Sequence, residues 1–267
     1  MDELKFWEDV IKLPIIADRT KKWSPSMLER VLTDYIIRCS VECFILNNDT
    51  LCTTLSGGLD SSFCLAKLRK AVGPNNEIHS FTIGTNEDHL DIKFARMVSQ
   101  EFDTIHHEII PSKKEIHEAQ EEILRLWEDE VLWPGDVAVF LTYKSIAQNG
   151  FKAVIAHDGI DELLGGYWEH RRYDEDKRKK KEVFEDFWSR IESEHLLPLE
   201  KKARHFGVKV ILPYLQAGIV KYISKIPLNS RSNFIESKIP LRLIAKNYLP
   251  DEIIRRSKKG FCGALER

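Results

Sequence analysis

The chain has 267 residues, of which 43% are apolar and 31% charged, and its 40 basic and 42 acidic side chains nearly cancel. This composition excludes intrinsic disorder and disfavours a dedicated nucleic-acid-binding protein. No stretch approaches the ~20 apolar residues of a membrane span, and the acidic start MDELKFWEDV does not resemble a signal peptide. The five cysteines form no C-x-x-C pair, so we expect reduced thiols in a cytoplasmic protein.

Two helices are expected before residue 49. The second has clear start signals, with Ser24 as N-cap and Pro25 at the first helical position. Ser26 and Glu29 offer a competing capping box, which leaves the boundary open. The apolar residues after Pro25 follow a helical period.

From residue 49 the pattern alternates between short apolar runs and helical stretches. The apolar runs predict strands at 51–55, 78–83, 104–110 and 153–156. Such alternation is typical of βαβ units, so we expect a doubly wound α/β fold whose parallel sheet is covered on both faces. Strand signals vanish after about residue 167. We therefore predict N-terminal helices over 1–48, an α/β core over 49–167 and a helical C-terminal part over 168–267.

The string LSGGLDSS, residues 55–62, lies between a predicted strand and a predicted helix. Its two glycines allow a sharp turn and close approach to a ligand. Backbone amides of the loop and the first helical turn can then face an anion, which the helix dipole favours. Asp60 is unexpected beside an anion unless it holds Mg²⁺, which binds carboxylates together with phosphate oxygens. The alternative is an ordinary strand–turn–helix junction with serine caps.

A second polar cluster, HDGIDELLGGY, follows the fourth predicted strand. Because parallel strands end at the same edge of a sheet, we expect Asp158, Asp161 and Glu162 to lie near Asp60. Asp60 and Asp161 would suit a magnesium pyrophosphate clamp. The alternative is an acidic helix start, since Asp and Glu favour the first turn of any helix.

Both strings resemble known motifs. The first matches the S-G-G-x-D-S pyrophosphate loop (PP-loop) of the N-type ATP pyrophosphatases. The second resembles the S-G-[ED]-G-x-D-E-L-x-G-G-Y segment of the asparagine synthetase family. Three further stretches resemble that family in the same order, and the likeness covers roughly residues 49 to 263: HSFTIG with DIKFARMVSQEFDTIHHEI, VKVILPYLQAGIVKYISKIP, and ESKIPLRLIAKNYLPDEIIRRSKKGF.

The resemblance implies a Rossmann-like PP-loop fold and a reaction with ATP and Mg²⁺. A carboxylate is adenylated, pyrophosphate leaves, and the acyl group passes to ammonia or an amine. Lys258 then matches the catalytic lysine, Lys238 a lysine that contacts phosphate or pyrophosphate, and Asp158 a carboxylate associated with proton handling or the intermediate. The residues that the resemblance assigns to ATP binding are Leu55, Ser56, Gly57, Gly58, Asp60, Ser61, Ser62, Ile83, His157 and Gly159; Leu55, Ile83 and His157 fall where the adenine and ribose pocket lies.

Three features depart from the family pattern. Only about fifty residues precede the phosphate loop, so we expect no glutaminase here; nitrogen would come from free ammonia, a separate glutaminase subunit or an amine. His157 replaces a usual glycine, and its imidazole either stacks on the base or reshapes the pocket, or it is a hydrogen-bonded structural histidine. Gln216 replaces the aspartate of a P-F-L-D motif, which indicates an acceptor pocket that is not built for aspartate.

Two other interpretations stay open. In one, the acceptor is a tRNA base or a peptide carboxylate, and the basic run Lys177–Lys181 docks RNA. In the other, the protein is a non-catalytic partner that retains nucleotide binding. His106 and His107 are expected to be structural, not metal ligands. The sequence does not determine the acceptor, the nitrogen source or whether the protein is a homo-oligomer.

Overall fold

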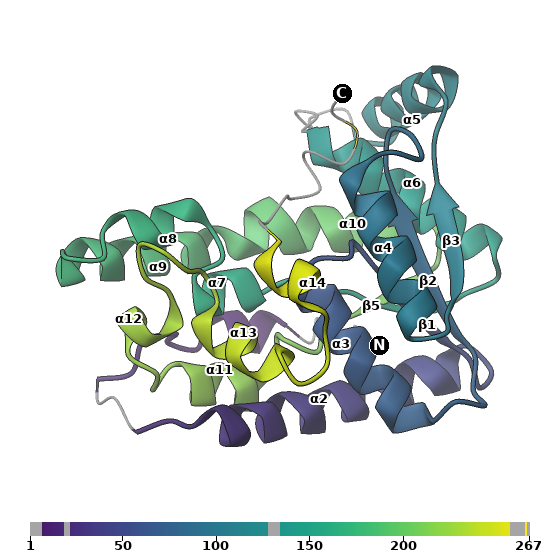
Figure 1. The fold of residues 1–267 in the computed structure, drawn as a ribbon. Coiled ribbons are helices and arrows are strands. Elements are labelled where there is room, and N and C mark those ends of the chain that lie inside the picture. The colour runs from purple at the N-terminus through teal and green to yellow at the C-terminus, as the bar shows by residue number, and fades with distance from the viewer. Residues whose placement is uncertain (1–6, 19–21, 128–133, 257–264, 266–267) are drawn as a thin grey trace.

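The protein is built on one parallel β-sheet, with strand order β3-β2-β1-β4-β5. A computed structural model describes residues 7–18, 22–127, 134–256 and 265. Figure 1 shows the sheet on one side of the molecule and α8, α9, α11, α12 and α13 on the other. The strands are β1 (Leu51–Thr54), β2 (Ile78–Ile83), β3 (Ile105–Ile109), β4 (Ala153–Ile155) and β5 (Lys209–Ile211).

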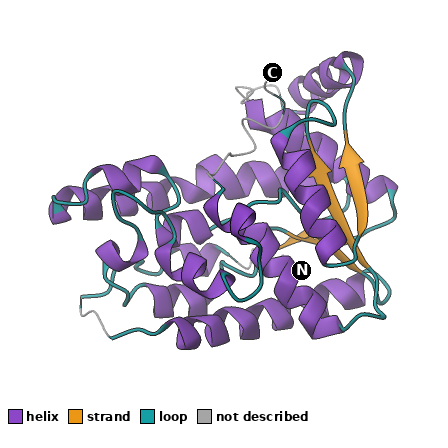
Figure 2. Ribbon diagram, viewed as in Figure 1, coloured by secondary structure: helices purple, strands orange, loops and turns teal. Residues whose placement is uncertain are grey.

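Helices surround the sheet and make up most of the remaining structure (Figure 2). They are α1 (Glu8–Ile11), α2 (Pro25–Leu46), α3 (Leu59–Val72), α4 (Leu90–Glu101), α5 (Lys113–Leu126), α6 (Pro134–Gln148), α7 (Ile160–Leu164), α8 (Trp168–Arg172), α9 (Lys177–Ile191), the π-helix η1 (Glu192–Leu196), α10 (Leu197–His205), α11 (Ala217–Ile223), α12 (Leu228–Arg231), α13 (Ile239–Ala245) and α14 (Asp251–Arg255). In the described part of the chain, none of these combines the length and apolar character needed to cross a membrane.

The doubly wound α/β fold and its four predicted strands are confirmed. The expectation of no strand after residue 167 was wrong, because Lys209–Ile211 pairs in parallel with β4 as β5. Three residues, one of them an exposed lysine, are too short for the alternation that identifies a strand. The sheet therefore includes a strand from the predicted helical part, while the three-part division of the chain stays a prediction.

Helix α2 runs along both the side of the protein that holds the sheet and the side that holds α11 and α13 (Figure 1). Its predicted start is confirmed, since Ser24 accepts a hydrogen bond from the backbone of Met27 at 3.2 Å and Pro25 opens the helix. Glu29 does not close the competing capping box but pairs with Lys67 of α3, Nζ to Oε1 2.6 Å. The buried face of α2 packs on α3, β1, β4, α11 and α13. Each large side chain on it contributes roughly 1.5–3 kcal/mol by burial.

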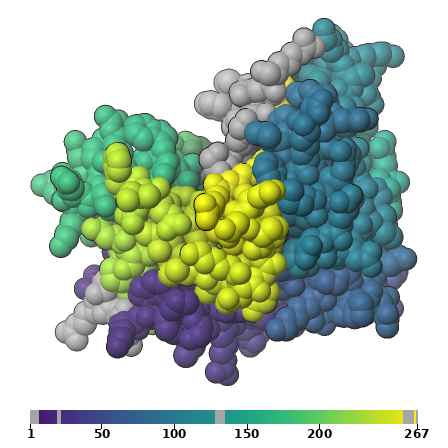
Figure 3. Space-filling model, viewed as in Figure 1, coloured from purple at the N-terminus to yellow at the C-terminus, as the bar shows by residue number. Residues whose placement is uncertain are grey.

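The C-terminal helices complete the body of the molecule. In Figure 3 the yellow residues of the chain's last part pack between the green helices and the blue residues around α3 and α4. Helix α13 packs against both α2 and α3, and α14 packs against α3. Because α3 begins at the phosphate loop, these contacts place the C-terminal helices beside it.

The histidines of β3 form hydrogen bonds with side chains of β2. His106 Nδ1 lies 2.7 Å from Ser80 Oγ, and His107 Nε2 lies 2.8 Å from His79 Nδ1. Throughout the described ranges, no group of three or more His, Cys, Asp or Glu side chains is arranged to hold a metal ion. These histidines thus join β2 to β3 by hydrogen bonds.

Arg231 is a fully buried guanidinium that lies outside the candidate site. It donates hydrogen bonds to the backbone carbonyls of Ile226, Leu163 and Ser224 at 2.9, 3.2 and 3.0 Å. Burial lowers the pKa of Arg231 to about 9. The side chain therefore joins the ends of α7, α11 and α12.

Replacing Arg231 by methionine is expected to destabilise the protein by about 3 kcal/mol, because three buried carbonyls lose their donor. The measurement is the free energy of unfolding in denaturant. The control is Arg190→Met, since exposed Arg190 forms its ion pairs with Asp186 and Glu194, one turn away on the helix surface. That change should stay within about 0.5 kcal/mol. Equal losses in the two variants would contradict the assignment.

Candidate active site

The predicted phosphate loop connects β1 to α3, and serine hydroxyls fix its shape. Ser61 Oγ accepts from the backbone amide of Ser56 at 3.3 Å and donates to the Gly58 carbonyl at 3.3 Å. Ser56 Oγ in turn accepts from the Gly58 amide at 3.3 Å. Gly58 is the N-cap of α3, a helix of 14 residues. The positive end of the helix dipole therefore faces this loop, which suits an anion.

Gly57 can only be glycine in this loop. Its φ of +64° is a left-handed conformation, and a Cβ added there would lie 2.3 Å from the carbonyl carbon of Phe94. The loop thus packs directly on the backbone of α4. Gly57, one of the two glycines predicted for close approach to a ligand, permits this close approach to α4.

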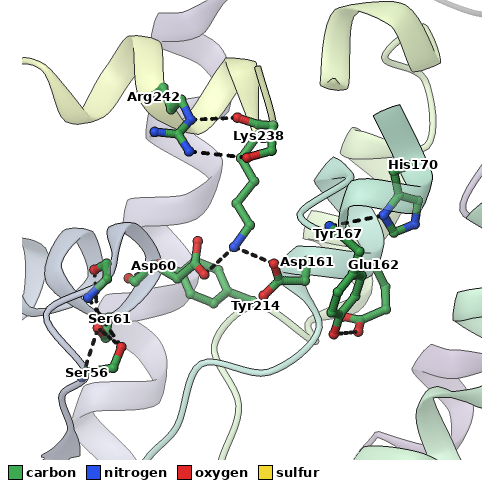
Figure 4. Close-up of polar contacts among 12 residues, drawn as sticks. Ser56, Asp60, Ser61, Asp161, Glu162, Tyr167, His170, Tyr214, Lys238 and Arg242 are labelled. Carbon is green, nitrogen blue, oxygen red and sulfur yellow. Dashed lines mark hydrogen bonds and ion pairs between the residues drawn. The ribbon is translucent and has the colours of Figure 1, made fainter. Parts of the chain in front are cut away.

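Two carboxylates and one ammonium meet beside the loop. Asp60 lies in the first turn of α3 and Asp161 in the first turn of α7, while Lys238 is the N-cap of α13. Lys238 Nζ lies 2.6 Å from Asp161 Oδ1 and also donates to Asp60 Oδ2. Figure 4 shows the lysine side chain reaching from α13 to both carboxylates. The predicted convergence of Asp60 and Asp161 is therefore present in the structure.

Lys238 is buried, with 4% of its surface exposed. Burial by itself lowers the pKa of its ammonium, but the charges of Asp161 and Asp60 outweigh burial, and the net pKa is raised. The lysine is therefore protonated at neutral pH. A charge buried at this depth is stable only because it is paired.

The backbone conformation at Lys238 directs its side chain toward Asp60 and Asp161. Lys238 has φ +51°, a left-handed conformation that costs a non-glycine residue about 1–2 kcal/mol. Arg242 fixes this turn by donating to the carbonyl of Ser237 at 2.7 Å and to its hydroxyl at 3.2 Å. Gly166 leaves room on the other side, since a Cβ there would lie 1.7 Å from Asp161 Oδ1 and 2.6 Å from Lys238 Cε.

His157 makes a structural hydrogen bond at the end of β4. Its Nε2 lies 2.9 Å from the carbonyl oxygen of Thr54 and 3.2 Å from Thr53 Oγ1. Burial lowers the pKa of His157 to about 4, so the ring is neutral at neutral pH and donates to the Thr54 carbonyl. The structural alternative for this residue is supported, and the bond joins the β4 loop to the end of β1.

The depressed pKa of His157 predicts acid sensitivity. The unfolded chain takes up a proton near pH 6.5 and the folded protein only near pH 4, so stability present above 6.5 falls as pH drops through this window. The expected slope is up to about 1.4 kcal/mol per pH unit for this group. Unfolding free energies at pH 4–7 should show a smaller slope for His157→Gln than for the wild type. Identical slopes would contradict the prediction.

The other predicted residues lie at the same edge of the sheet but not all together. Leu55 and Ile83 follow β1 and end β2, and both are buried, in separate apolar clusters. Gly159 is the N-cap of α7. Asp158 directly precedes Gly159 and lies near two buried tyrosines, Tyr143 and Tyr167. Burial raises the pKa of both tyrosines, and the negative charge of Asp158 raises each pKa further. Lys258, the predicted catalytic lysine, lies outside the described residues.

Three residues make contacts at the site that were not predicted from the sequence. Tyr214 Oη donates to the Asp60 carbonyl at 2.8 Å, and Tyr167 Oη donates to Glu162 Oε1 at 2.8 Å. Arg256 donates to the Ser56 carbonyl at 2.6 Å and also pairs with Asp91. The signal for Arg256 was its place in the R-x-K-x-G-F string, two residues before Lys258.

These features define an α/β protein with a glycine-rich loop at the point where the strand order of the parallel sheet reverses. Strand β1 pairs with β2 on one side and with β4 on the other, which is the usual ligand position in such sheets. The family model described as asparagine synthase matches residues 35–204 and 182–266. The chain belongs to the asparagine synthase family.

Curated relatives agree with this family. The chain is 29% identical over 231 residues to asparagine synthetase [glutamine-hydrolyzing] 2 of Oryza sativa subsp. japonica, covering 79% of this chain and 38% of the rice protein. It is also 29% identical over 231 residues to an asparagine synthetase [glutamine-hydrolyzing] of Zea mays. The identity is again 29%, over 221 residues, to a probable asparagine synthetase [glutamine-hydrolyzing] of Acanthamoeba polyphaga mimivirus. Each of these two matches covers 79% of this chain and 39% of the relative. The chain spans about two fifths of these relatives' length.

Proposed function

We propose that this protein is an ATP-dependent carbon–nitrogen ligase that forms AMP. It adenylates a carboxylate, releases pyrophosphate and transfers the acyl group to ammonia or an amine. The observation that carries the proposal is the convergence of Asp60 and Asp161 on one cation beside the loop at the start of α3. Membership of the asparagine synthase family supports it.

In the first step an oxygen of the substrate carboxylate attacks the α-phosphorus of ATP. A new P–O bond forms, the bond between the α-phosphorus and the bridging oxygen breaks, and pyrophosphate leaves with that oxygen. The protein contributes positioning and charge neutralisation. The loop amides and the start of α3 hold the phosphates, helped by the hydroxyls of Ser56, Ser61 and Ser62.

The carboxylate pair fits Mg²⁺. One oxygen from a carboxylate on α3 and one from a carboxylate on α7 approach a single ammonium nitrogen, with one separation of 2.6 Å, so both can reach one cation. Magnesium takes one or two protein carboxylates and completes its shell with phosphate oxygens and water. Asp60 and Asp161 would hold the ion, which would supply charge neutralisation on the leaving pyrophosphate.

In the second step a nitrogen attacks the acyl carbon, the acyl–oxygen bond to the phosphate breaks, and AMP leaves. The family resemblance assigns Lys258 to stabilise negative charge in this step. Asp158 lies between β4 and α7 and is a candidate to accept the proton that the nitrogen loses. A fixed ammonium facing a developing oxyanion contributes about 10²–10³ in rate by analogy with other donors.

The acceptor is described only by its chemical class. Gln216, where the family has an aspartate, is buried, and its side-chain amide donates to the Leu212 carbonyl at 3.1 Å. Its polar group is thus used within its own turn. For this reason we propose a carboxylate acceptor and do not assign aspartate.

The test is pyrophosphate release from Mg-ATP with a panel of carboxylates, including aspartate, with and without ammonium. We expect one carboxylate to trigger release and Lys258→Ala to abolish amide formation. Lys259→Ala is the matched control and should retain activity. Release that ignores Lys258 would overturn its assignment, and no release with any carboxylate would overturn the proposed reaction.

The RNA-docking alternative receives little support from the basic run at the start of α9. Lys180 is buried and pairs with Asp174 at 2.7 Å. Arg178 and Lys181 pair with Glu182 and Glu185 one turn further along the helix. Much of the positive charge is therefore already neutralised within the protein.

A further inference from the structure

We propose that Lys238 excludes free divalent cations from the Asp60–Asp161 pair, so that metal enters the site only together with the nucleotide. This inference rests on the proposed function, because it concerns the same carboxylates. It assigns Lys238 a specificity-determining role, which is to distinguish a metal–phosphate complex from a bare metal ion.

The first argument is the position of the ammonium. Lys238 Nζ contacts one oxygen of each carboxylate, where a cation shared by the pair would lie. A divalent ion and an ammonium cannot both lie within contact distance of these two oxygens, because at such separations two cations in a poorly solvated site repel strongly. Metal binding through both carboxylates therefore requires the lysine to leave them.

The second argument is the charge balance of the exchange. Two carboxylates and one lysine carry a net charge of −1, and a divalent ion that displaces the lysine neutralises the pair but leaves a buried ammonium without its partners. Burial of such a charge is strongly unfavourable. A nucleotide corrects this balance, since its phosphate oxygens offer the displaced ammonium a new anionic partner. The exchange is thus unfavourable for the bare ion and favourable for the metal–nucleotide complex.

The third argument is that the backbone of Lys238 is held in a position that directs its side chain to the carboxylate pair. Its backbone adopts a strained left-handed conformation fixed by Arg242, and its side chain lies against Gly166, where no Cβ could fit. Strain that the surrounding structure maintains is typical of functional positions. Lys67, another buried lysine, needs no such turn, since it lies within α3 and forms an ion pair with Glu29.

The experiment measures Mn²⁺ binding by electron paramagnetic resonance, which needs no catalysis. Free wild-type protein should bind Mn²⁺ weakly and should gain a bound ion when α,β-methylene-ATP is added. Lys238→Met should bind one Mn²⁺ without nucleotide at least about tenfold more tightly than the wild type, because the pair has lost its counter-ion. Adding Asp161→Asn to that variant should remove the new site.

Two matched variants separate charge from burial. Lys67→Met removes another buried lysine and should leave Mn²⁺ binding as weak as in the wild type. Lys238→Arg keeps the positive charge and should still exclude the free ion. Mn²⁺ should also raise the melting temperature of Lys238→Met and not that of the wild type, because a ligand stabilises the form that binds it.

Equal Mn²⁺ affinity of wild type and Lys238→Met without nucleotide would overturn the inference. So would a site in the free wild type that Asp161→Asn abolishes, an outcome that needs no Lys238 variant to fold. Failure of the proposed reaction has a different signature. It would appear as absent pyrophosphate release with every carboxylate, while the Mn²⁺ results stayed as expected.

Discussion

Replacing Asp161 by asparagine is expected to lower magnesium-dependent pyrophosphate release by about 10²–10³-fold, because the site loses one of the two carboxylates that would hold the ion. The shape of the side chain is kept, so α7 should still form. Asp60→Asn should have a similar effect. The measurement is kcat for pyrophosphate release as a function of Mg²⁺ concentration.

The matched control is Glu29→Gln. Glu29 also pairs with a buried lysine at 2.6 Å, but it lies on α2 and outside the loop. It should lower stability and leave the magnesium dependence unchanged. Similar losses of release in Glu29→Gln and Asp161→Asn would show that any buried ion pair matters equally, and the clamp assignment would fail.

Gly57→Ala is expected to abolish nucleotide binding and to destabilise the fold by more than the roughly 1–2 kcal/mol of an ordinary left-handed alanine. The added methyl would lie 2.3 and 2.4 Å from backbone atoms of α4, so the loop or the helix must move. Nucleotide binding can be followed by titration with a fluorescent ATP analogue, and stability by chemical denaturation.

Gly207 provides a matched comparison for this change. Its φ is +70°, close to that of Gly57, but an added Cβ would meet no atom within 4 Å. Gly207→Ala should therefore show only the backbone cost and should bind nucleotide normally. If the two variants lost the same stability and both bound nucleotide, the close packing of the loop on α4 would not be required for nucleotide binding.

Most of the sheet could be predicted because its central strands, β1, β2 and β4, are largely buried on both faces. Leu51–Thr54 and Ile78–Ile83 consist mostly of apolar or small residues between turn signals, and such runs identify central parallel strands. Strand β5 was not predicted because it lies at the edge of the sheet and has only three residues. Its pairing with β4 is decided by tertiary contact, which local sequence does not record.

The site was predictable where it depends on the loops that follow strands. Asp60 and Asp161 lie in the first turns of the helices that follow β1 and β4, so the topology of the sheet brings them to one edge. The role of Lys238 was predictable only through family likeness, because its place between the carboxylates depends on how α13 packs. Nothing in its local sequence indicates a left-handed turn. The hydrogen bond from His157 to Thr54 likewise joins residues 103 positions apart.

The long separation of Lys238 from its partners has a consequence for how the protein is synthesised. Lys238 follows Asp60 by 178 positions, so both carboxylates leave the ribosome well before their counter-charge. Until α13 docks, two like charges at one edge of the sheet repel each other and favour a more open arrangement there. The last helices thus supply the charge that lets this edge close, and a nascent chain halted before residue 238 should expose its phosphate loop to proteases that the finished protein resists.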